Sequence, residues 1–507
     1  PGLEALLVTP FQAPATALEQ RLAGLWAALL GVERVGRHDS FFALGGHSLL
    51  AIQLVSQLQQ AGLALTLADL FQHVTLEALA QVLEQRAAAP GEQPQVVVVR
   101  EGGSQPPLFL VHDFTGLDGY FPVLGRQVPG DFPIYGLPGT GPDEAPLQTL
   151  ECLAARLIER MRTVQPHGPY RLAGWSFGGV LAYEVAAQLL GMDETVAFLG
   201  LIDSYVPRLT DRGKAYWQGP ALLQRQLLEH CRAQWRAQGD SGLDAMAGVR
   251  ALEEQGLGFS ALLGQCRAQQ LLPAELAQAD DAPLRHYLLR ELAHGHALAH
   301  YRVEPLGIDL HLFRAEQRST QQVPRSPSLG WGEWLPTQVV QCIPVPGDHQ
   351  SMMQAPHVEA LGQALGKALA AAPSGVRHAA APATLLAIQS GQPGRVPLFC
   401  VPGAGDSVTS FLGLVEALGP DWPVYGLQPR GLDGVGVPHS RVEAAAECHV
   451  QAIEALYPQG PLSLVGHSFG GWVAHAMAVK LEARGRTVTS LTLIDSEAPD
   501  GQGTCGQ

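Results

Sequence analysis

The stretch Gly174-Trp175-Ser176-Phe177-Gly178 decides the fold of the region around it. A short apolar run, 169–173, precedes it, and a helix-compatible stretch of small and apolar residues follows it. A Gly-x-Ser-x-Gly pentapeptide between a strand and a helix forms a sharp turn that lifts the serine hydroxyl above the sheet, and the flanking glycines let this turn close. We therefore expect a strand, a tight turn and a helix here, with Ser176 placed as a nucleophile.

A second copy, Gly466-His467-Ser468-Phe469-Gly470, follows 292 positions later (466 − 174). Asp203 and Asp495 each end a β-type apolar run, and each follows its serine by 27 positions (203 − 176 and 495 − 468). The matching segments are 107–111 with 397–401, 133–137 with 423–427, and 201–204 with 493–496. Strands that alternate with amphipathic helical stretches predict a mostly parallel sheet flanked by helices, and a repeat this long indicates a domain duplication.

Two segments rich in alanine, proline and glycine, 87–94 and 370–382, have the composition of linkers. They divide the chain into an N-terminal unit at 13–88, a first α/β unit at 96–371 and a second at 383–507. The 507 residues are 46% hydrophobic, which is enough to give each unit a core.

The composition also excludes several classes of protein. A formal charge of −15 without basic clusters argues against nucleic acid and anionic membrane as partners. No apolar run is long enough to span a membrane, and no signal peptide begins the chain, so the sequence predicts a cytoplasmic protein. The seven cysteines lack paired or metal-type spacing, which predicts reduced thiols and no metal site.

The N-terminal unit has apolar residues at helical spacing on both sides of the string 39–49, Asp-Ser-Phe-Phe-Ala-Leu-Gly-Gly-His-Ser-Leu. Ser48 in this string could be a plain helix N-cap. The alternative is that it carries a phosphodiester, because a helix N-terminus offers unsatisfied N–H groups and a partial positive charge.

This string resembles the 4′-phosphopantetheine attachment site of peptidyl carrier domains in nonribosomal peptide synthetases, with Ser48 as the attachment residue. The resemblance implies a small all-α four-helix bundle, a phosphopantetheinyl transferase and upstream synthetase modules as partners. Each α/β unit resembles the thioesterase domain of such assembly lines, an α/β-hydrolase, through its Gly-x-Ser-Phe-Gly-Gly and Leu-Ile-Asp-Ser strings. A carrier followed by two thioesterases is similar to the tandem arrangement of some lipopeptide and depsipeptide synthetases.

A serine hydroxyl is a poor nucleophile at neutral pH, so Ser176 needs a histidine base and an acid that orients this histidine. The α/β-hydrolase order of serine, aspartate and histidine places the base beyond Asp203. His349 is the best candidate because it follows the β-like run 339–345 in a Gly-Asp-His loop, and the family carries its histidine in a similar loop. The other candidates lie mostly in helical-looking stretches and are more typical of surface or core histidines: His230, His286, His294, His296, His300, His311 and His357.

The oxyanion that forms when the serine attacks needs two preorganised N–H donors. We expect them to be the backbone N–H groups of Phe177 and of Phe114, which lies in the loop after an early strand. The first unit departs from the family here, because the second unit has the more usual Pro-Gly-Ala-Gly at 402–405. The corresponding donors of the second unit are Ala404 and Phe469. Asp113 beside Phe114 is expected to face outward.

Between Asp203 and His349 lie 145 residues (349 − 203 − 1), more than a sheet connection requires. Apolar residues at helical spacing predict a helical lid over about 205–305. The alternative is an inert insertion. A lid would matter because a site that excludes water favours attack by a nucleophile within the acyl chain.

The second unit has Ser468 and Asp495 but no histidine beyond His475. We therefore expect it to be represented only in part, without its base, its lid and its last strands. A chain that has been cut short, a remainder that is not represented, and a naturally shortened scaffold are all compatible with the sequence.

The predicted activity is that of a serine acyl-transfer enzyme. A peptidyl thioester held on the arm of Ser48 moves to Ser176 and is released by macrolactone or macrolactam formation or by hydrolysis. The alternatives are thioesterases that hydrolyse linear or misloaded chains, a stand-alone esterase or lipase, a pair of degenerate binding modules, and a polyketide-type carrier.

Overall fold

The computed structural model describes the chain with gaps. The described residues are 11–41, 43–44, 54, 58, 70, 73, 75–87, 96–117, 119–141, 147–207, 221–237, 243–273, 276–277, 279–317, 326–335, 339–372, 385–432 and 437–497.

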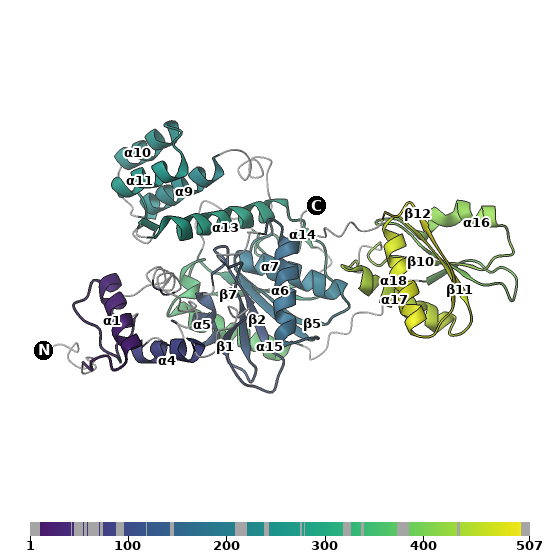
Figure 1. The fold of residues 1–507 in the computed structure, drawn as a ribbon, viewed down its shortest axis with the longest axis horizontal. Coiled ribbons are helices and arrows are strands. Elements are labelled where there is room, and N and C mark those ends of the chain that lie inside the picture. The colour runs from purple at the N-terminus through teal and green to yellow at the C-terminus, as the bar shows by residue number, and fades with distance from the viewer. Residues whose placement is uncertain are drawn as a thin grey trace.

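The described part of the N-terminal region contains the helices α1 at Ala17–Leu30 and α4 at Leu76–Ala87 (Figure 1). The side chain of Thr16 accepts a hydrogen bond from Glu19 N and so caps α1. Trp26 and Phe41 meet edge to face at 5.1 Å and are fully buried in the core of this region. Ser48 lies outside the described residues, so the structure does not test the expected count of four helices.

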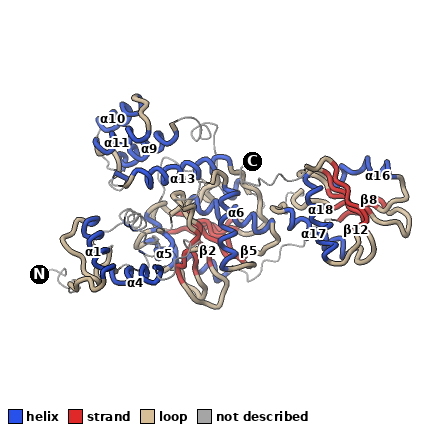
Figure 2. Tube along the Cα trace, in the orientation of Figure 1, coloured by secondary structure: helices blue, strands red, loops and turns tan. Residues whose placement is uncertain are grey.

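The first α/β unit is a seven-stranded sheet with the order β1-β3-β2-β4-β5-β6-β7. Only the edge pair β1 and β3 is antiparallel, so the sheet is mostly parallel, as the alternation of strands with helical stretches predicts. Figure 2 shows the strands between helices. The strands are β1 Val97–Arg100, β2 Leu108–Val111, β3 Ile134–Leu137, β4 Tyr170–Trp175, β5 Val196–Ile202, β6 Leu310–Ala315 and β7 Val340–Val345.

Two buried clusters cover the two faces of this sheet. One cluster includes residues of α6 and α7, and the other includes residues of α5 and α15. Strands β4 and β5 are apolar along most of their length because both of their faces are buried. The helices are α5 Tyr120–Gly125, α6 Leu150–Val164, α7 Phe177–Gly191, α14 Trp331–Trp334, the 3-10 turn Ser351–Met353 and α15 His357–Ala371.

The segment between Asp203 and His349 contains the expected helices. They are α9 Leu222–Ala237, α10 Leu243–Glu254, α11 Phe259–Ala268 and α13 Asp281–His300. The first three pack with the start of α13 around a core of their own, which includes Leu227, Leu263 and Leu288. In Figure 1, α13 crosses above the α/β unit and carries α9, α10 and α11 on its far side.

The second α/β unit is a five-stranded sheet with the order β12-β11-β9-β10-β8. It repeats the first five strands of the first unit, including the antiparallel edge pair β8 and β10. Its elements are β8 Leu385–Gln389, β9 Leu398–Val401, the 3-10 turn Val408–Phe411, α16 Leu412–Leu418, β10 Val424–Leu427, α17 Val442–Leu456, β11 Leu462–His467, α18 Phe469–Ala483 and β12 Val488–Ile494.

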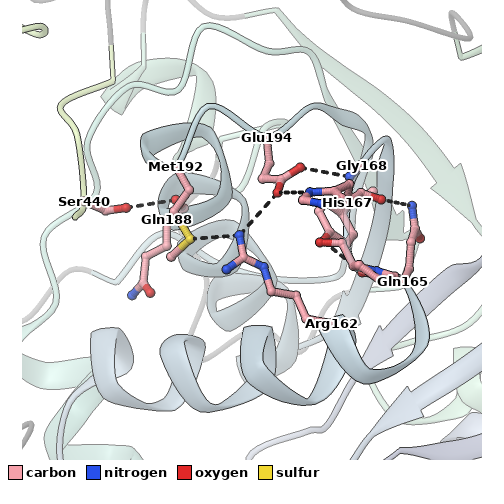
Figure 3. Close-up of polar contacts among 10 residues, drawn as sticks. Arg162, Gln165, His167, Gly168, Gln188, Met192, Glu194 and Ser440 are labelled. Atoms are coloured by element: carbon pink, nitrogen blue, oxygen red, sulfur yellow. Dashed lines mark hydrogen bonds and ion pairs between the residues drawn. The ribbon is translucent and has the colours of Figure 1, made fainter. Parts of the chain in front are cut away.

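The second unit contacts the first at the C-terminal end of α7. Ser440 Oγ donates to the carbonyl oxygen of Gln188 at 3.0 Å (Figure 3), and Ser440 N donates to that of Gly191 at 3.1 Å. Arg430 donates to the carbonyl oxygen of Leu190 and pairs with Asp193. Ser440 N thus satisfies the last carbonyl group of α7, the other two donors add to carbonyl groups that also accept backbone N–H groups, and the cation complements the helix dipole.

Within the described residues, no helix is long and apolar enough to cross a membrane. Five cysteines there are free thiols: Cys231, Cys266, Cys342, Cys400 and Cys448. Cys152 is disulfide-bonded. This corrects the expectation of a reduced thiol for Cys152 alone, because pairing depends on which residues the fold brings together and not on their spacing.

Candidate active site

The turn from β4 into α7 holds Ser176 in a backbone conformation that non-glycine residues rarely adopt, with φ 55° and ψ −119°. Its N–H donates to the carbonyl oxygen of Ile202 at 2.9 Å, which ties the turn to β5. A Cβ on Gly174 would lie 2.0 Å from the carbonyl oxygen of Gly178, so only glycine fits at Gly174. The strand, tight turn and helix that the sequence predicts are therefore present.

The structure brings Ser176, Asp203 and His349 together from three separate parts of the chain. His349 Nε2 lies 3.1 Å from Ser176 Oγ, and His349 Nδ1 lies 2.7 Å from Asp203 Oδ2. A histidine between a hydroxyl and a buried carboxylate can accept the proton of the hydroxyl, while the carboxylate fixes its tautomer.

Asp203 is held by the strand next to β5. It follows β5 with φ 43° and is only 2% exposed. Its second carboxylate oxygen, Oδ1, accepts a hydrogen bond from Ala315 N on β6 at 3.0 Å. Both oxygens therefore have partners, and the carboxylate cannot turn away from the histidine without breaking a buried hydrogen bond.

The loop that carries His349 is fixed by its neighbours. Asp348 Oδ1 accepts hydrogen bonds from Gln350 N and Ser351 N, at 3.0 and 2.8 Å. Trp175 Nε1, one residue before the serine, donates to the carbonyl oxygen of His349 at 3.2 Å. Trp175 and Ser351 are not among the expected site residues, because Trp175 lies 174 positions before His349 and Ser351, although only two positions after it, is not part of the Gly-Asp-His pattern.

Phe114 and Phe177 lie close together, with ring centroids 5.7 Å apart and the rings nearly perpendicular. Phe177 is the first residue of α7, where backbone N–H groups have no partner within the helix. Phe114 lies in the loop after β2. The structure therefore brings the two expected oxyanion residues of the first unit to the same end of the sheet.

Two buried histidines support this loop. His112 Nδ1 lies 2.8 Å from the carbonyl oxygen of Asp113, and His294 Nδ1, on α13, lies 2.8 Å from that of Phe114. Burial lowers the pKa of His112 well below its usual range and that of His294 to about 4. Both rings are therefore neutral near pH 7 and donate from Nδ1. No local pattern predicts this role for His294, since its partner lies 180 positions away.

Asp113 does not face outward as expected. Its carboxylate turns back onto its own loop, where Oδ1 accepts hydrogen bonds from Thr115 N at 2.9 Å and from Thr115 Oγ1 at 2.5 Å. Burial raises the pKa of this carboxyl above its usual value, although the hydrogen bonds from Thr115 lower it. The Thr115 N–H is only two residues away, so the Asp113 carboxylate can reach it. The carboxylate thereby becomes part of the hydrogen bonding that holds the loop.

The second elbow has the same backbone but fewer partners. Ser468 has φ 52° and ψ −125°, and its N–H donates to the carbonyl oxygen of Ile494 at 2.8 Å. Asp495 follows β12 with φ 49° and is exposed. Among the residues that the structure describes, no histidine is hydrogen-bonded to Ser468. The expected oxyanion residues of the second unit are Phe469, which begins α18, and Ala404. Ala404 follows Gly403, and a Cβ built on Gly403 would lie 3.4 Å from Ser468 Cβ.

The described part of the chain contains no group of three or more histidine, cysteine, aspartate or glutamate side chains that could hold a metal ion. Ser48 lies outside that part, and its assignment as the attachment residue stays a prediction.

Comparisons with known protein families match nearly the whole chain. Residues 106–369 and 396–504 match the family described as the thioesterase domain, and residues 20–83 match the phosphopantetheine attachment site. The order of these matches confirms an attachment-site region followed by two thioesterase segments. It also confirms 4′-phosphopantetheine as the prosthetic group that the sequence predicts.

Several curated relatives are much longer than this chain. Malpinin synthetase of Mortierella alpina is 40% identical over 208 residues, which are 40% of this chain and 3% of that protein. The probable non-canonical nonribosomal peptide synthetase CymA of Salinispora arenicola (strain CNS-205) is 31% identical over 375 residues, 71% of this chain and 4% of that protein. A solved structure of a four-domain nonribosomal peptide synthetase, AB3403, is 31% identical and covers 71% of this chain and 26% of its own, with a TM-score of 0.46.

Proposed function

Because the chain belongs to the thioesterase domain family, we propose that it is the carrier and release region of a nonribosomal peptide synthetase. It accepts a peptidyl thioester, transfers the peptide to Ser176 and releases it by macrocyclisation or hydrolysis. The names of its relatives support this context, although the chain spans only 3% and 4% of the two synthetases compared above. Upstream synthetase modules and a phosphopantetheinyl transferase are the partners that this function requires.

The observation that carries the proposal is the hydrogen-bonded series from Ser176 through His349 to Asp203. In our mechanism, His349 Nε2 takes the proton of Ser176 Oγ as this oxygen attacks the thioester carbonyl. The carbon–sulfur bond then breaks, the proton passes from His349 to the departing thiolate, and an acyl ester remains on Ser176. Asp203 accepts the Nδ1–H of His349 and stabilises its positive charge throughout.

The attachment of the substrate assigns a separate role to Ser48. In the proposed carrier, at 13–88, the Ser48 hydroxyl forms the phosphodiester with 4′-phosphopantetheine. When bound, this group supplies the thiol that holds the peptide as a thioester. Ser48 is therefore a tether and takes no part in the proton transfers at Ser176.

The developing oxyanion is stabilised by the N–H groups of Phe177 and Phe114. The N-terminus of α7 supports the first assignment, because its N–H groups and helix dipole favour negative charge there. The anchored carbonyl of Asp113 supports the second, because it shares a peptide unit with the Phe114 N–H and a donor must be fixed before the charge develops.

The fate of the acyl ester on Ser176 depends on which nucleophile reaches it first. Attack by water gives a linear acid, and attack by a hydroxyl or amine of the same peptide gives a ring. We assign the helices within about 205–305 as a lid that limits water over the site in the unit 96–371. Hydrolysis of linear or misloaded chains is the second function, and it would follow if the lid leaves the ester open to water.

We assign the second unit, 383–507, a supporting role. Its site would consist of Ser468, Asp495 and a histidine base, with Ala404 and Phe469 as oxyanion donors. This site would share the acyl group with Ser176 or clear stalled chains. The support for this order is that Ser176 has its histidine and buried acid beside it, whereas Ser468 has no such partner among the described residues.

The test compares two substrates in the same chain. Peptide loaded on the carrier by a phosphopantetheinyl transferase and a soluble peptidyl N-acetylcysteamine thioester are each followed by mass spectrometry of the product. Ser48→Ala should abolish release of the carrier-bound peptide and leave turnover of the soluble thioester, since Ser48 is only a tether. Loss of both activities would contradict the carrier assignment, and the mass of the product distinguishes ring closure from hydrolysis.

A further inference from the structure

The loop 112–117 is anchored through the carbonyl groups on both sides of Phe114. The carbonyl oxygen of Asp113 accepts hydrogen bonds from His112 Nδ1 at 2.8 Å and from Gly116 N at 3.0 Å. The carbonyl oxygen and the N–H of a trans peptide point in opposite directions in one plane. Fixing the carbonyl of Asp113 therefore fixes the direction of the Phe114 N–H, which belongs to the same peptide unit.

His294 brings the lid helix α13 into this arrangement. Its Nδ1–H donates to the carbonyl oxygen of Phe114 at 2.8 Å, and its ring stacks on Phe177 with centroids 4.8 Å apart and an interplanar angle of 16°. The side chain is 1% exposed. One residue of α13 thus contacts both residues that we assign as oxyanion donors.

Arg290 contacts the same loop one helical turn before His294, and residues four apart lie on one face of a helix. Gly116 has φ 73°, and a Cβ there would lie 2.7 Å from Arg290 Nε. Arg290 Nη1 also donates to the carbonyl oxygen of Thr140 at 3.2 Å. This face of α13 therefore packs directly on the loop backbone, so a shift of the helix would move the loop with it.

Leu117, at the other end of the loop, belongs to a different contact. It packs against the buried core of the N-terminal carrier region, the cluster that contains Trp26 and Phe41. Its N–H donates to Thr115 Oγ1 at 3.2 Å, which keeps it continuous with the anchored part of the loop. The carrier region and the lid helix therefore meet on one loop of six residues.

We propose that the loop 112–117 is a junction at which Leu117 docks the carrier region and His294 acts as a positioning residue for Phe114, whose own carbonyl group it holds. The occupant of the docking contact is the carrier region of this chain, whose core Leu117 already touches. This inference rests on the proposed function, because a positioned N–H matters only if Ser176 forms an oxyanion. Docking of the carrier and position of the lid then both act on the geometry of the oxyanion site.

The first experiment tests His294 with the soluble peptidyl N-acetylcysteamine thioester and the complete chain. His294→Leu removes the donor and should lower kcat by about 100-fold, the scale of a small misplacement of a reacting group, with KM changed less than about threefold. His294→Asn keeps an N–H near the place of Nδ1 and should recover most of this loss. The rate at which a fluorophosphonate labels Ser176 should follow the same order, since its adduct also places an oxygen among the donors.

A fall in kcat that His294→Asn fails to rescue would overturn the positioning role, and so would a change confined to KM. The thermal unfolding midpoints of His294→Leu and His294→Asn should be equal. This control shows that the difference in kcat between the two variants does not come from a loss of folding. Failure of the proposed function looks different, because the wild type would then show no turnover that Ser176→Ala removes.

The second experiment tests Leu117 through a ratio of two rates. Leu117→Ser should lower the rate for carrier-bound peptide by about tenfold relative to the rate for the soluble thioester, because the hydroxyl weakens apolar packing on the carrier core. Leu412→Ser changes an exposed leucine of the second unit, 53% accessible, and should leave the ratio as in the wild type. An unchanged ratio in Leu117→Ser would overturn the docking contact, as would an equal change in Leu412→Ser.

Discussion

The two elbows of this chain have nearly the same backbone and very different surroundings. Ser176 and Ser468 differ by only 3° in φ and 6° in ψ (55° and −119° against 52° and −125°). Asp203 is 2% exposed and bonded to His349, whereas Asp495 is exposed. The pentapeptide and the next strand are therefore sufficient for the turn, but not for the arrangement of groups around the serine.

The neighbouring strands explain the difference. In the first unit β6 lies beside β5, and Ala315 N on β6 binds the carboxylate of Asp203. In the second unit β12 is the edge of the described sheet, and Leu493 and Ile494 are 47% and 38% exposed. A buried carboxylate that a neighbouring strand orients, such as Asp203, can hold the imidazole of a histidine in place. A solvated carboxylate such as Asp495 does this less well.

Replacing each serine should give the largest contrast between the units. Ser176→Ala should lower release of carrier-bound peptide by about 10⁶-fold, the scale at which loss of a nucleophile removes the whole set of groups. Ser468→Ala in the same chain should change it by less than about twofold, because no described histidine is bonded to Ser468. Single-turnover release from a loaded carrier measures both. Full release by Ser176→Ala would reverse the assignment of the two units.

Replacing each acid should also affect the two units differently. Asp203→Asn should lower turnover of the soluble thioester by up to about 10⁴-fold, because an amide no longer holds the required tautomer of His349. Asp495→Asn is the matched control and should have no measurable effect. Steady-state kinetics with equal unfolding midpoints checks both variants. A loss below about tenfold in Asp203→Asn would mean that another carboxylate serves His349.

A buried glutamate distinguishes the two helices that follow the elbows. Burial raises the pKa of Glu184 on α7 to about 7, although Gln188 and Tyr301 donate hydrogen bonds to it, whereas the corresponding residue of α18 is Ala476. A carboxyl with a raised pKa in the folded state binds more protons than in the unfolded state between about pH 4.5 and 7. The stability of the first unit therefore falls as the pH rises through this range.

Glu184→Gln should remove this dependence. The free energy of unfolding of the variant should exceed that of the wild type by about 3 kcal/mol at pH 8. The two values should match near pH 4, because at that pH the wild-type carboxyl is neutral in the folded and the unfolded state. Denaturant unfolding at the two pH values measures the difference. Glu482→Gln changes an exposed residue of α18 and should leave the free energy of unfolding unchanged at both pH values. If Glu184→Gln gains the same amount of stability at both pH values, the gain does not come from titration of the Glu184 carboxyl.

The smallest expected effect concerns the contact between the units. Arg430→Ala removes the partner of Asp193 and the donor to Leu190, which should weaken the contact by about 1 kcal/mol. Small-angle scattering should then show a larger maximum dimension than in the wild type. Arg395→Ala lies outside this contact and should leave the dimension unchanged. The same value in Arg430→Ala and the wild type would show that other groups hold the units together.

The sequence predicted the carrier motif, the two α/β units and the residues Ser176, Asp203 and His349, because each is encoded in a short local pattern. Gly-x-Ser-x-Gly forces a turn, an acid at the end of an apolar run marks a strand end, and Gly347-Asp348-His349 follows a β-like run. These patterns depend on backbone sterics and on strand periodicity, which act over a few residues.

The groups that support these residues come from distant parts of the chain and depend on how it packs. The bond from His294 to a loop 180 positions away and the contact of Leu117 with the carrier core join segments that no local pattern relates. Burial sets the pKa of His294 and Glu184, and burial exists only after packing. Local sequence thus chose the reacting groups, and long-range packing chose their exposure, protonation and partners.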